Sequence, residues 1–259
     1  MTSPVRAIWL ATSWLTIIPV PQPTGTAAAG AGAAPTRRDG GAALAATPVI
    51  GAFLGAVLAA TAYGLSHTHL PEFMIGLILV AITGLITRGM HLDGLADTAD
   101  GLGCFGTPER AQQVMREGSV GPFGAATLVL TIALTATGFG ALTADQHWLS
   151  IGYAVLVGRT AAVLTCRASL KPFASSGFGA LVIGTQRTSA WLWTIATLTA
   201  GVAVEVDQPW RGPMAAAGAL LVVWCFAAHC ARRFSGLSGD TLGAVIEIAT
   251  AASLIGLII

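Results

Sequence analysis

The stretch that decides the fold is GLILVAITGLITRGMHLDGLADTADGLG, residues 76–103, in which an apolar run is followed directly by three aspartates. The whole chain of 259 residues is as apolar as the first part of this stretch suggests: 54% of its residues are hydrophobic and only 10% are charged. Soluble domains carry about 25% charged residues. The composition therefore predicts a polytopic membrane protein, and the net charge of +1 argues against a nucleic-acid partner.

Membrane-spanning helices need about 20 consecutive apolar residues. Seven windows satisfy or approach this length: 43–66, 72–88, 120–143, 150–166, 189–206, 213–230 and 241–259. We expect an all-α, polytopic integral membrane bundle of about seven transmembrane helices. Together they form one membrane-embedded catalytic domain over residues 1–259.

The N-terminal segment 5–18 is apolar but too short to span a membrane, and a proline-rich stretch follows it. With Arg6 in front it is compatible with a signal peptide. We favour a retained helix that is interfacial or re-entrant. Residues 24–36 are rich in glycine and alanine and predict a flexible linker.

The basic residues orient the bundle. With seven crossings, one set of turns holds only Arg211, whereas the opposite set holds Arg37, Arg38, Arg88, Arg110, Arg116, Arg167, Lys171, Arg187, Arg232 and Arg233. The positive-inside rule places the second set in the cytoplasm. Two long, glycine-rich loops, 88–119 and 167–188, are expected on that side, so we expect the chemistry there.

Asp93, Asp97 and Asp100 are spaced i, i+4, i+7, so a helix would carry them on one face. Like charges stacked beside a bilayer repel one another, and a divalent cation would remove this cost. Magnesium is held by carboxylates together with substrate phosphates. The alternative is a solvated helix end with three incidental aspartates.

A second acidic pair, Asp240 and Glu247, shares one face of the last apolar window. A carboxylate inside a membrane indicates a functional site, although a hydrogen bond to a neighbouring helix would also explain Glu247. Ser238 and Gly239 precede this helix, and its N-terminus could bind a phosphate. Asp240 as the N-cap is the competing interpretation.

Three arginines complete the candidate site. Arg159 and Arg167 are eight residues apart and share a face, and Arg116 lies in the glycine-containing stretch 116–124. Arginine suits bidentate phosphate contacts. For Arg159, an ion pair with Glu247 is the alternative. Carboxylates, arginines and glycine-rich loops at one membrane face indicate phosphoryl transfer.

The stretch RGMHLDGLADTADGLG, residues 88–103, closely resembles the signature of the cobalamin synthase family, the adenosylcobinamide-GDP ribazoletransferases. Further resemblances follow in order along the chain: TIIPVP at 16–21, TPVIGAFLG at 47–55, GRTAA at 158–162, SSGFGALVIG at 175–184 and SGLSGDTLGAVIEI at 235–248. The chain departs from the family at 116–119, where Arg-Glu-Gly-Ser replaces a basic-Asp-Ser run.

This resemblance implies a transferase of the bacterial inner membrane that completes cobalamin. It would transfer the adenosylcobinamide-phosphate group from adenosylcobinamide-GDP to α-ribazole or its 5′-phosphate, releasing GMP and requiring Mg²⁺. We expect Asp93, Asp97 and Asp100 to bind the metal, with Asp240 and Glu247 completing the catalytic set. The expected substrate contacts come from His91, Arg116, Arg159, Arg167, Ser238 and Gly239.

Two other enzyme or transport classes use comparable residues. A CDP-alcohol phosphotransferase carries spaced aspartates on membrane helices, but Thr98 stands where its motif has arginine. A cation transporter would place carboxylates along a pathway, yet the sequence shows no internal repeat. A non-enzymatic scaffold, which would tolerate loss of the aspartates, is the third alternative.

Overall fold

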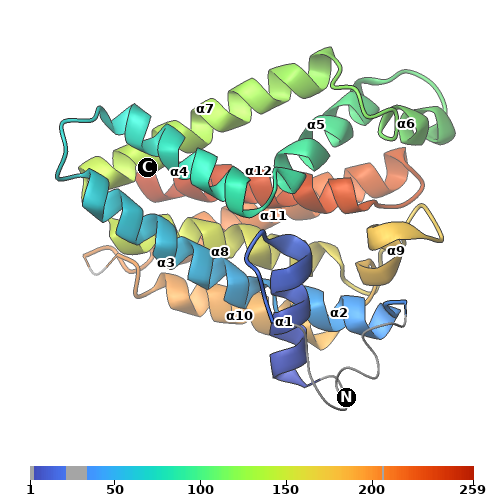
Figure 1. The fold of residues 1–259 in the computed structure, drawn as a ribbon, viewed down its shortest axis with the longest axis horizontal. Helices are drawn as coiled ribbons and strands as arrows, with labels where there is room; N and C mark the ends of the chain where they lie inside the picture. The colour runs from blue at the N-terminus through green and yellow to red at the C-terminus, as the bar shows by residue number, and fades with distance from the viewer. Residues whose placement is uncertain (1–2, 22–33, 206) are drawn as a thin grey trace.

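Long helices run side by side in one bundle, and shorter helices cover one end of it (Figure 1). The computed structural model describes residues 3–21, 34–205 and 207–259; within them all regular structure is helical, apart from two isolated bridges. The helices are α1 Pro4–Leu15, α2 Arg37–Ala45, α3 Thr47–Leu65, α4 Glu72–Ile86, α5 Met90–Gly103, α6 Pro108–Val114, α7 Pro122–Ala144, α8 Trp148–Thr165, α9 Gly177–Val182, α10 Thr188–Gly201, α11 Arg211–Arg233 and α12 Gly239–Ile258. The expected all-α class is confirmed.

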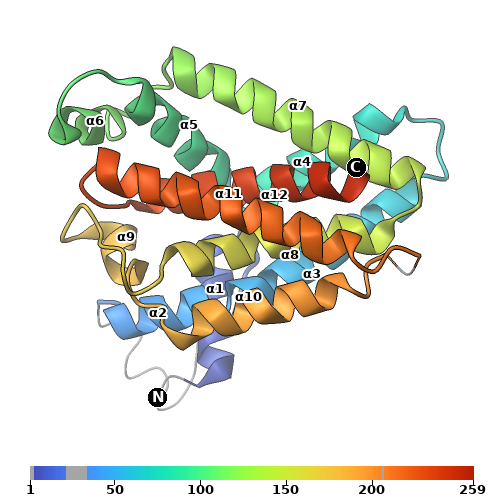
Figure 2. The same cartoon turned by 180° about the vertical axis from the view of Figure 1, so that it is seen from behind.

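Helix α8 lies at the centre of the bundle. It contacts α3, α7, α10, α11 and α12, and almost all of its side chains are buried. Helices α11 and α12 pack along each other behind it, as Figure 2 shows from the opposite side. The chain is therefore a multi-pass membrane bundle organised around one buried helix.

Each of the seven apolar windows contains a helix, but not every helix is long enough to cross a bilayer. Among the described residues, five candidate spans are long and apolar enough: residues 37–65, 122–144, 148–165, 211–233 and 239–258. A sixth is obtained if α4 and α5 count as one broken span. Helix α10 has 14 residues and extends only about 21 Å. The expected count of seven is not confirmed.

Glycine brings the helices of the bundle into backbone contact. A β-carbon at Gly55 of α3 would overlap the backbone of Gly152 in α8. A β-carbon at Gly76 of α4 would overlap Ala136 in α7. In lipid, where the hydrophobic effect does not drive helices together, this close packing supplies the attraction.

The segment 88–119, which we expected to be a long loop, is largely helical, whereas 167–188 is a loop that contains one short helix. Residues 90–103 form α5 and residues 108–114 form α6, while α9 occupies 177–182 of the second segment. The glycines and charged residues of these segments predicted irregular structure. Helix α5 forms nevertheless, because it packs against α12 and α7. Helix α5 leaves α4 at a bend of 94°, where Arg88 and Gly89 have φ of 56° and 70°.

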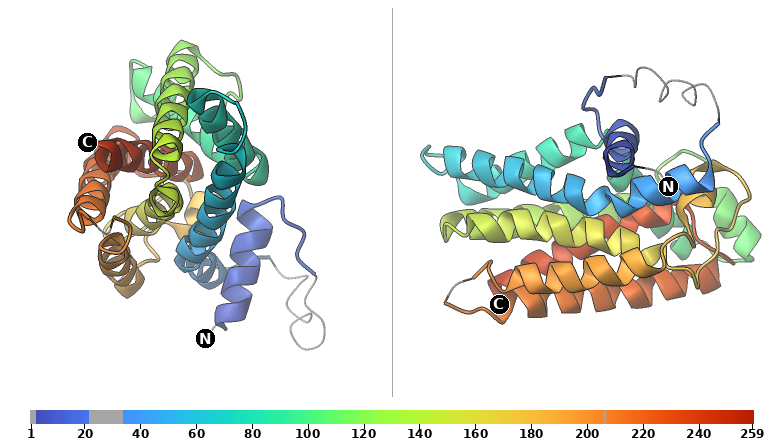
Figure 3. Two further views of the ribbon diagram at one scale, coloured as in Figure 1. Left: turned by 90° about the vertical axis from the view of Figure 1, so that its left-hand side faces the viewer. Right: turned by 90° about the horizontal axis from the view of Figure 1, so that it is seen from below.

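The N-terminal segment forms a helix, as expected for 5–18. Helix α1 packs on α2 and α3 and crosses the direction of the bundle rather than joining it (Figure 3). The predicted linker over 24–36 lies, for residues 24–33, outside the described residues.

Candidate functional site

Helices α5 and α12 cross at two glycines, and this crossing builds the site. A β-carbon at Gly94 would lie 2.6 Å from the carbonyl oxygen of Asp240. Further along the same contact, a β-carbon at Gly243 would lie 3.0 Å from the Cα of His91. The two helices therefore run antiparallel in backbone contact. The fold thus joins the aspartates of α5 to the acidic pair of α12, which lies more than 130 residues further along the chain.

The crossing brings together Asp93, Asp97 and Asp240, which we call the carboxylate cluster. Asp93 is exposed, whereas Asp97 and Asp240 are partly buried. Asp97 lies within electrostatic range of both other members. Among the described residues, no ion pair involves any of the three. Three negative charges thus face one another at the edge of the bundle without a basic partner.

Asp100 has a different environment from the other two aspartates of α5. Its carboxylate accepts hydrogen bonds from the backbone N–H groups of Gly121 at 2.7 Å and Gly124 at 2.9 Å. These groups belong to the N-terminus of α7, where a negative charge is favourable. Asp100 therefore fixes α7 to α5, and its expected role as a metal ligand stays a prediction.

The carboxylate cluster has the donor chemistry that Mg²⁺ requires. Among the described residues, no three His, Cys, Asp or Glu side chains converge closely enough to hold a metal by themselves. Magnesium, however, is typically bound by one or two carboxylates, with waters and substrate phosphates filling the other positions. The mutual repulsion within the cluster fits this mode of binding, in which the metal arrives with a phosphate-bearing substrate.

A second polar group lies deeper between the helices and consists of His91, Arg159 and Glu247. The Nδ1 atom of His91 lies 3.8 Å from Oε1 of Glu247, and Arg159 lies within electrostatic range of both. Arg159 is only 4% exposed. We call these three residues the buried polar layer.

A small cavity adjoins this layer. Arg159 and Glu247 line it together with Thr135 and Thr250, and it has about 20 Å³ of space for the centre of a water molecule. The Nη2 atom of Arg159 and the Oγ1 atom of Thr135 are buried without a hydrogen-bond partner. The cavity has room for about one water molecule, which would satisfy such groups.

The N-terminus of α12 is capped by Ser238, so the interpretation of Asp240 as the N-cap was wrong. The Oγ of Ser238 accepts a hydrogen bond from the N–H of Thr241 at 3.2 Å, within a reciprocal capping box. Asp240 occupies the first turn instead, where its charge interacts favourably with the helix dipole. In this position its carboxylate lies within electrostatic range of Asp93 and Asp97 on α5.

Segments from three parts of the chain surround this N-terminus. The carbonyl oxygen of Leu237 accepts a hydrogen bond from the N–H of Phe173, and its own N–H donates to the carbonyl of Lys171. The exposed Arg116 lies with its guanidinium 5.7 Å from the centre of the Phe173 ring. Arg116 is therefore at the same end of the bundle as the carboxylate cluster, as expected.

The structure places Arg167 away from the cluster, among aromatic side chains. Its guanidinium lies 3.6 Å from the centre of the Trp224 ring on α11. Burial lowers the pKa of the Arg167 guanidinium from its ordinary value. The stacking stabilises the cation where water is excluded. The expected contact between Arg167 and a substrate phosphate stays a prediction.

Three residues of the site escaped the sequence analysis. Gly94 allows α5 to touch Asp240, and Gly121 and Gly124 leave room for the Asp100 carboxylate. Each glycine belongs to a motif that was noticed for its glycine content. The signal for their partners was lacking, because a contact between distant helices leaves no local pattern.

Comparisons with known proteins identify relatives of the chain. The profile of the family described as cobalamin-5-phosphate synthase matches residues 7–258. Three curated proteins named adenosylcobinamide-GDP ribazoletransferase are similar. That of Frankia casuarinae is 37% identical, covering 85% of each chain. That of Corynebacterium diphtheriae is 33% identical over 93% of this chain and 87% of its own. That of Pseudomonas fluorescens is 31% identical over 96% and 98%. No solved structure matches.

Proposed function

The chain belongs to the cobalamin-5-phosphate synthase family and is a transferase, and on this premise we propose that it transfers adenosylcobinamide-phosphate from adenosylcobinamide-GDP to a ribazole acceptor. The acceptor is α-ribazole or its 5′-phosphate, and the same donor serves both. The new bond joins the acceptor oxygen to the phosphorus carried by cobinamide. The bond from that phosphorus to GMP breaks, and GMP leaves.

In either case the attacking group is a ribose hydroxyl of the acceptor, whose proton passes to a carboxylate. An acceptor that carries a 5′-phosphate keeps that phosphate, so the product is adenosylcobalamin or its 5′-phosphate. We assign the role of general base to one carboxylate of the cluster formed by Asp93, Asp97 and Asp240. The reaction needs no redox partner, because only phosphate–oxygen bonds are exchanged.

The observation that carries the proposal is the contact between Gly94 and Asp240, which gathers three unpaired carboxylates from two helices. In the proposal, one or two of the carboxylates of Asp93, Asp97 and Asp240 would hold Mg²⁺ together with water and phosphate oxygens of the donor. When bound, the metal would offset the negative charge that phosphoryl transfer places on the phosphate oxygens. Asp100 keeps α7 against α5, so the cluster stays in position during turnover.

Basic groups at the same end of the bundle bind the donor. The exposed Arg116 lies with its guanidinium over Phe173 and donates from Nε to the carbonyl oxygen of Gln112, which leaves Nη1 to contact a phosphate. The N-terminus of α12, at Ser238 and Gly239, contributes the positive end of a 20-residue helix. In this assignment the buried polar layer of His91, Arg159 and Glu247 stabilises the packing of the helices beneath the carboxylate cluster. The assignment does not require these three residues to contact the substrate.

We further propose that the site faces the cytoplasm of a bacterial inner membrane. The short helices α6 and α9 lie at one end of the bundle, and Arg110, Arg116 and Arg187 belong to this end (Figure 1). The turns at the other end hold Arg211 as their basic residue. This asymmetry supports the orientation through the positive-inside rule.

The test is an assay of the purified protein in nanodiscs with adenosylcobinamide-GDP, each acceptor and Mg²⁺, in which GMP and the cobamide product are measured. Asp97→Asn should lower kcat by on the order of 10³-fold, because it removes a charge that the metal needs. Asp145→Asn, the same change at the opposite end of α7, is the matched control and should retain full activity.

Two outcomes would overturn the proposal. One is normal Mg²⁺-dependent product formation by Asp97→Asn. The other is the absence of product with both acceptors, combined either with lipid product from a CDP-activated donor or with ion flux in proteoliposomes. Calorimetric titration of Mg²⁺ in the presence of donor gives a readout of the metal site that does not depend on turnover.

A further inference from the structure

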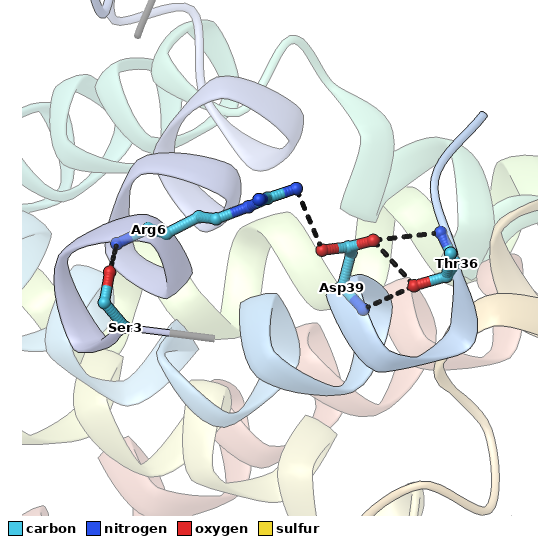
Figure 4. A network of polar contacts seen from close by, with 4 residues as sticks. All are labelled: Ser3, Arg6, Thr36 and Asp39. Carbon is cyan, nitrogen blue, oxygen red and sulfur yellow. Dashed lines mark hydrogen bonds and ion pairs between the residues drawn. The ribbon is translucent and has the colours of Figure 1, made fainter. Parts of the chain in front are cut away.

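Helix α1 is attached to the bundle at both of its ends. At its start, Arg6 forms an ion pair with Asp39 of α2 at 3.2 Å, next to the capping box that Asp39 shares with Thr36 (Figure 4). Near its end, the ring of Trp14 packs edge-on against Phe178 of α9, with centroids 6.4 Å apart. The helix therefore has a fixed position, although it is too short to span a membrane.

The most direct attachment is to the bend between α4 and α5. The Nη2 of Arg88 donates a hydrogen bond to the carbonyl oxygen of Trp14 at 2.8 Å. The N–H of Ile17 donates to the carbonyl oxygen of Ile86, the last residue of α4, at 2.7 Å. Two bonds thus join the end of α1 to the last residue of α4 and to the bend itself.

The bend determines where the aspartates point. Arg88 lies in the left-handed region with φ of 56°, a conformation that costs a residue with a side chain about 1 kcal/mol. Gly89 follows with φ of 70°, and its carbonyl accepts the hydrogen bond from the N–H of Asp93. A contact that stabilises this conformation of Arg88 therefore also fixes the direction in which the first turn of α5 begins.

The outer side of α1 is apolar and uncovered. Leu10 and Ala11 are buried against the bundle, whereas Val5 is 78% exposed and Ile17 is 63% exposed. Figure 1 shows α1 crossing the direction of the long helices, which places it roughly in the plane of a membrane that those helices span. Its end meets the last residue of α4, where the apolar run stops.

We propose that α1 is an in-plane helix of the membrane interface, and that its contact with lipid holds the α4–α5 bend and so positions the aspartates of α5. The apolar side chains enter the acyl boundary, while Arg6 and the indole groups of Trp9 and Trp14 lie at headgroup level. Arg88 is a positioning residue in this scheme. The consequence for turnover rests on the proposed function, but the lipid contact and the bend do not.

The lipid contact is tested by photocrosslinking in nanodiscs, with benzoylphenylalanine at position 5 or 17. Both positions should crosslink to phospholipid. The control is position 109 on α6, an exposed site away from the proposed boundary, which should not. Crosslinks from positions 5 and 17 to a second copy of the chain, or to neither lipid nor protein, would overturn the lipid assignment.

The positioning role is tested with Arg88→Met, which removes the donor, and Arg88→Lys, which keeps a cationic donor with the same backbone demand. Amide hydrogen exchange over residues 87–100 should rise on the order of tenfold in Arg88→Met and largely recover in Arg88→Lys. Arg110→Met, which removes an exposed ion pair with Glu117, is the matched control and should leave this exchange unchanged.

Turnover gives the second readout. Arg88→Met should lower kcat/KM for the donor, because in the proposed function the displaced aspartates take part in both donor binding and phosphoryl transfer. Unchanged exchange in Arg88→Met would overturn the positioning role. Altered exchange in a protein that forms no cobamide even as wild type would instead count against the proposed function alone.

Discussion

The carboxylate cluster and the buried polar layer both contain carboxylates from the crossing of α5 and α12 or its continuation, yet they differ in whether a basic residue lies nearby. In the cluster, Asp93, Asp97 and Asp240 form no ion pair with any residue that the structure describes. In the layer, Glu247 has Arg159 and His91 beside it. Uncompensated charge indicates a ligand that arrives from outside, whereas compensated charge indicates structure.

The two regions should respond in opposite ways to loss of a charge. Arg159→Met removes the cation that lies within electrostatic range of the buried Glu247, and an uncompensated buried charge costs about 3 kcal/mol or more. We expect the variant to unfold at markedly lower temperature in detergent, with a large loss of folded protein in the membrane. Asp97→Asn relieves repulsion and should unfold no earlier than the wild type.

A double variant sharpens this contrast. Arg159→Met combined with Glu247→Met removes both charges, so it should recover most of the stability lost in Arg159→Met. If Arg159→Met unfolds like the wild type but raises the KM for the donor at least tenfold, then Arg159 meets substrate phosphate. That result would contradict our interpretation of the buried polar layer as structural.

Sequence patterns predicted the helix that carries the aspartates of α5 but not the contacts that surround it. Charge and spacing placed Asp93 and Asp97 on one helix face, and α5 confirms that helix. The same glycines and charges predicted loops where α5 and α6 form, because stabilising contacts with α12 come from the far end of the chain. The hydrogen bonds from α7 to Asp100 could not be predicted from the sequence either, since they join residues more than 20 positions apart and produce no local pattern.

Gly94→Ala tests whether the crossing itself makes the cluster. The new β-carbon would lie 2.6 Å from the carbonyl oxygen of Asp240 and 2.8 Å from its Cα, so backbone would have to move. We expect a loss of about 2 kcal/mol of stability. We also expect kcat to fall by about 100-fold, because the carboxylates shift relative to the reacting phosphate.

The matched control for this change is Gly84→Ala on α4. A β-carbon there would meet only the side chain of Leu92, at an ordinary distance of 3.7 Å. It should keep both stability and turnover, as measured by thermal unfolding and GMP release. Full activity of Gly94→Ala would show that close contact between α5 and α12 is not what assembles the site.

Ser238→Ala gives the smallest expected effect and decides whether this serine belongs to the framework or to the substrate site. Loss of the hydrogen bond from Thr241 N–H should cost about 1 kcal/mol, while Ser238→Thr retains the cap. The KM for the donor should stay within about twofold in both variants, because the helix dipole persists without the hydroxyl. A tenfold rise in KM for Ser238→Ala alone would mean that the hydroxyl binds phosphate. The capping box would then be a resting arrangement that opens when the donor binds, and the substrate site would reach from the carboxylate cluster into the first turn of α12.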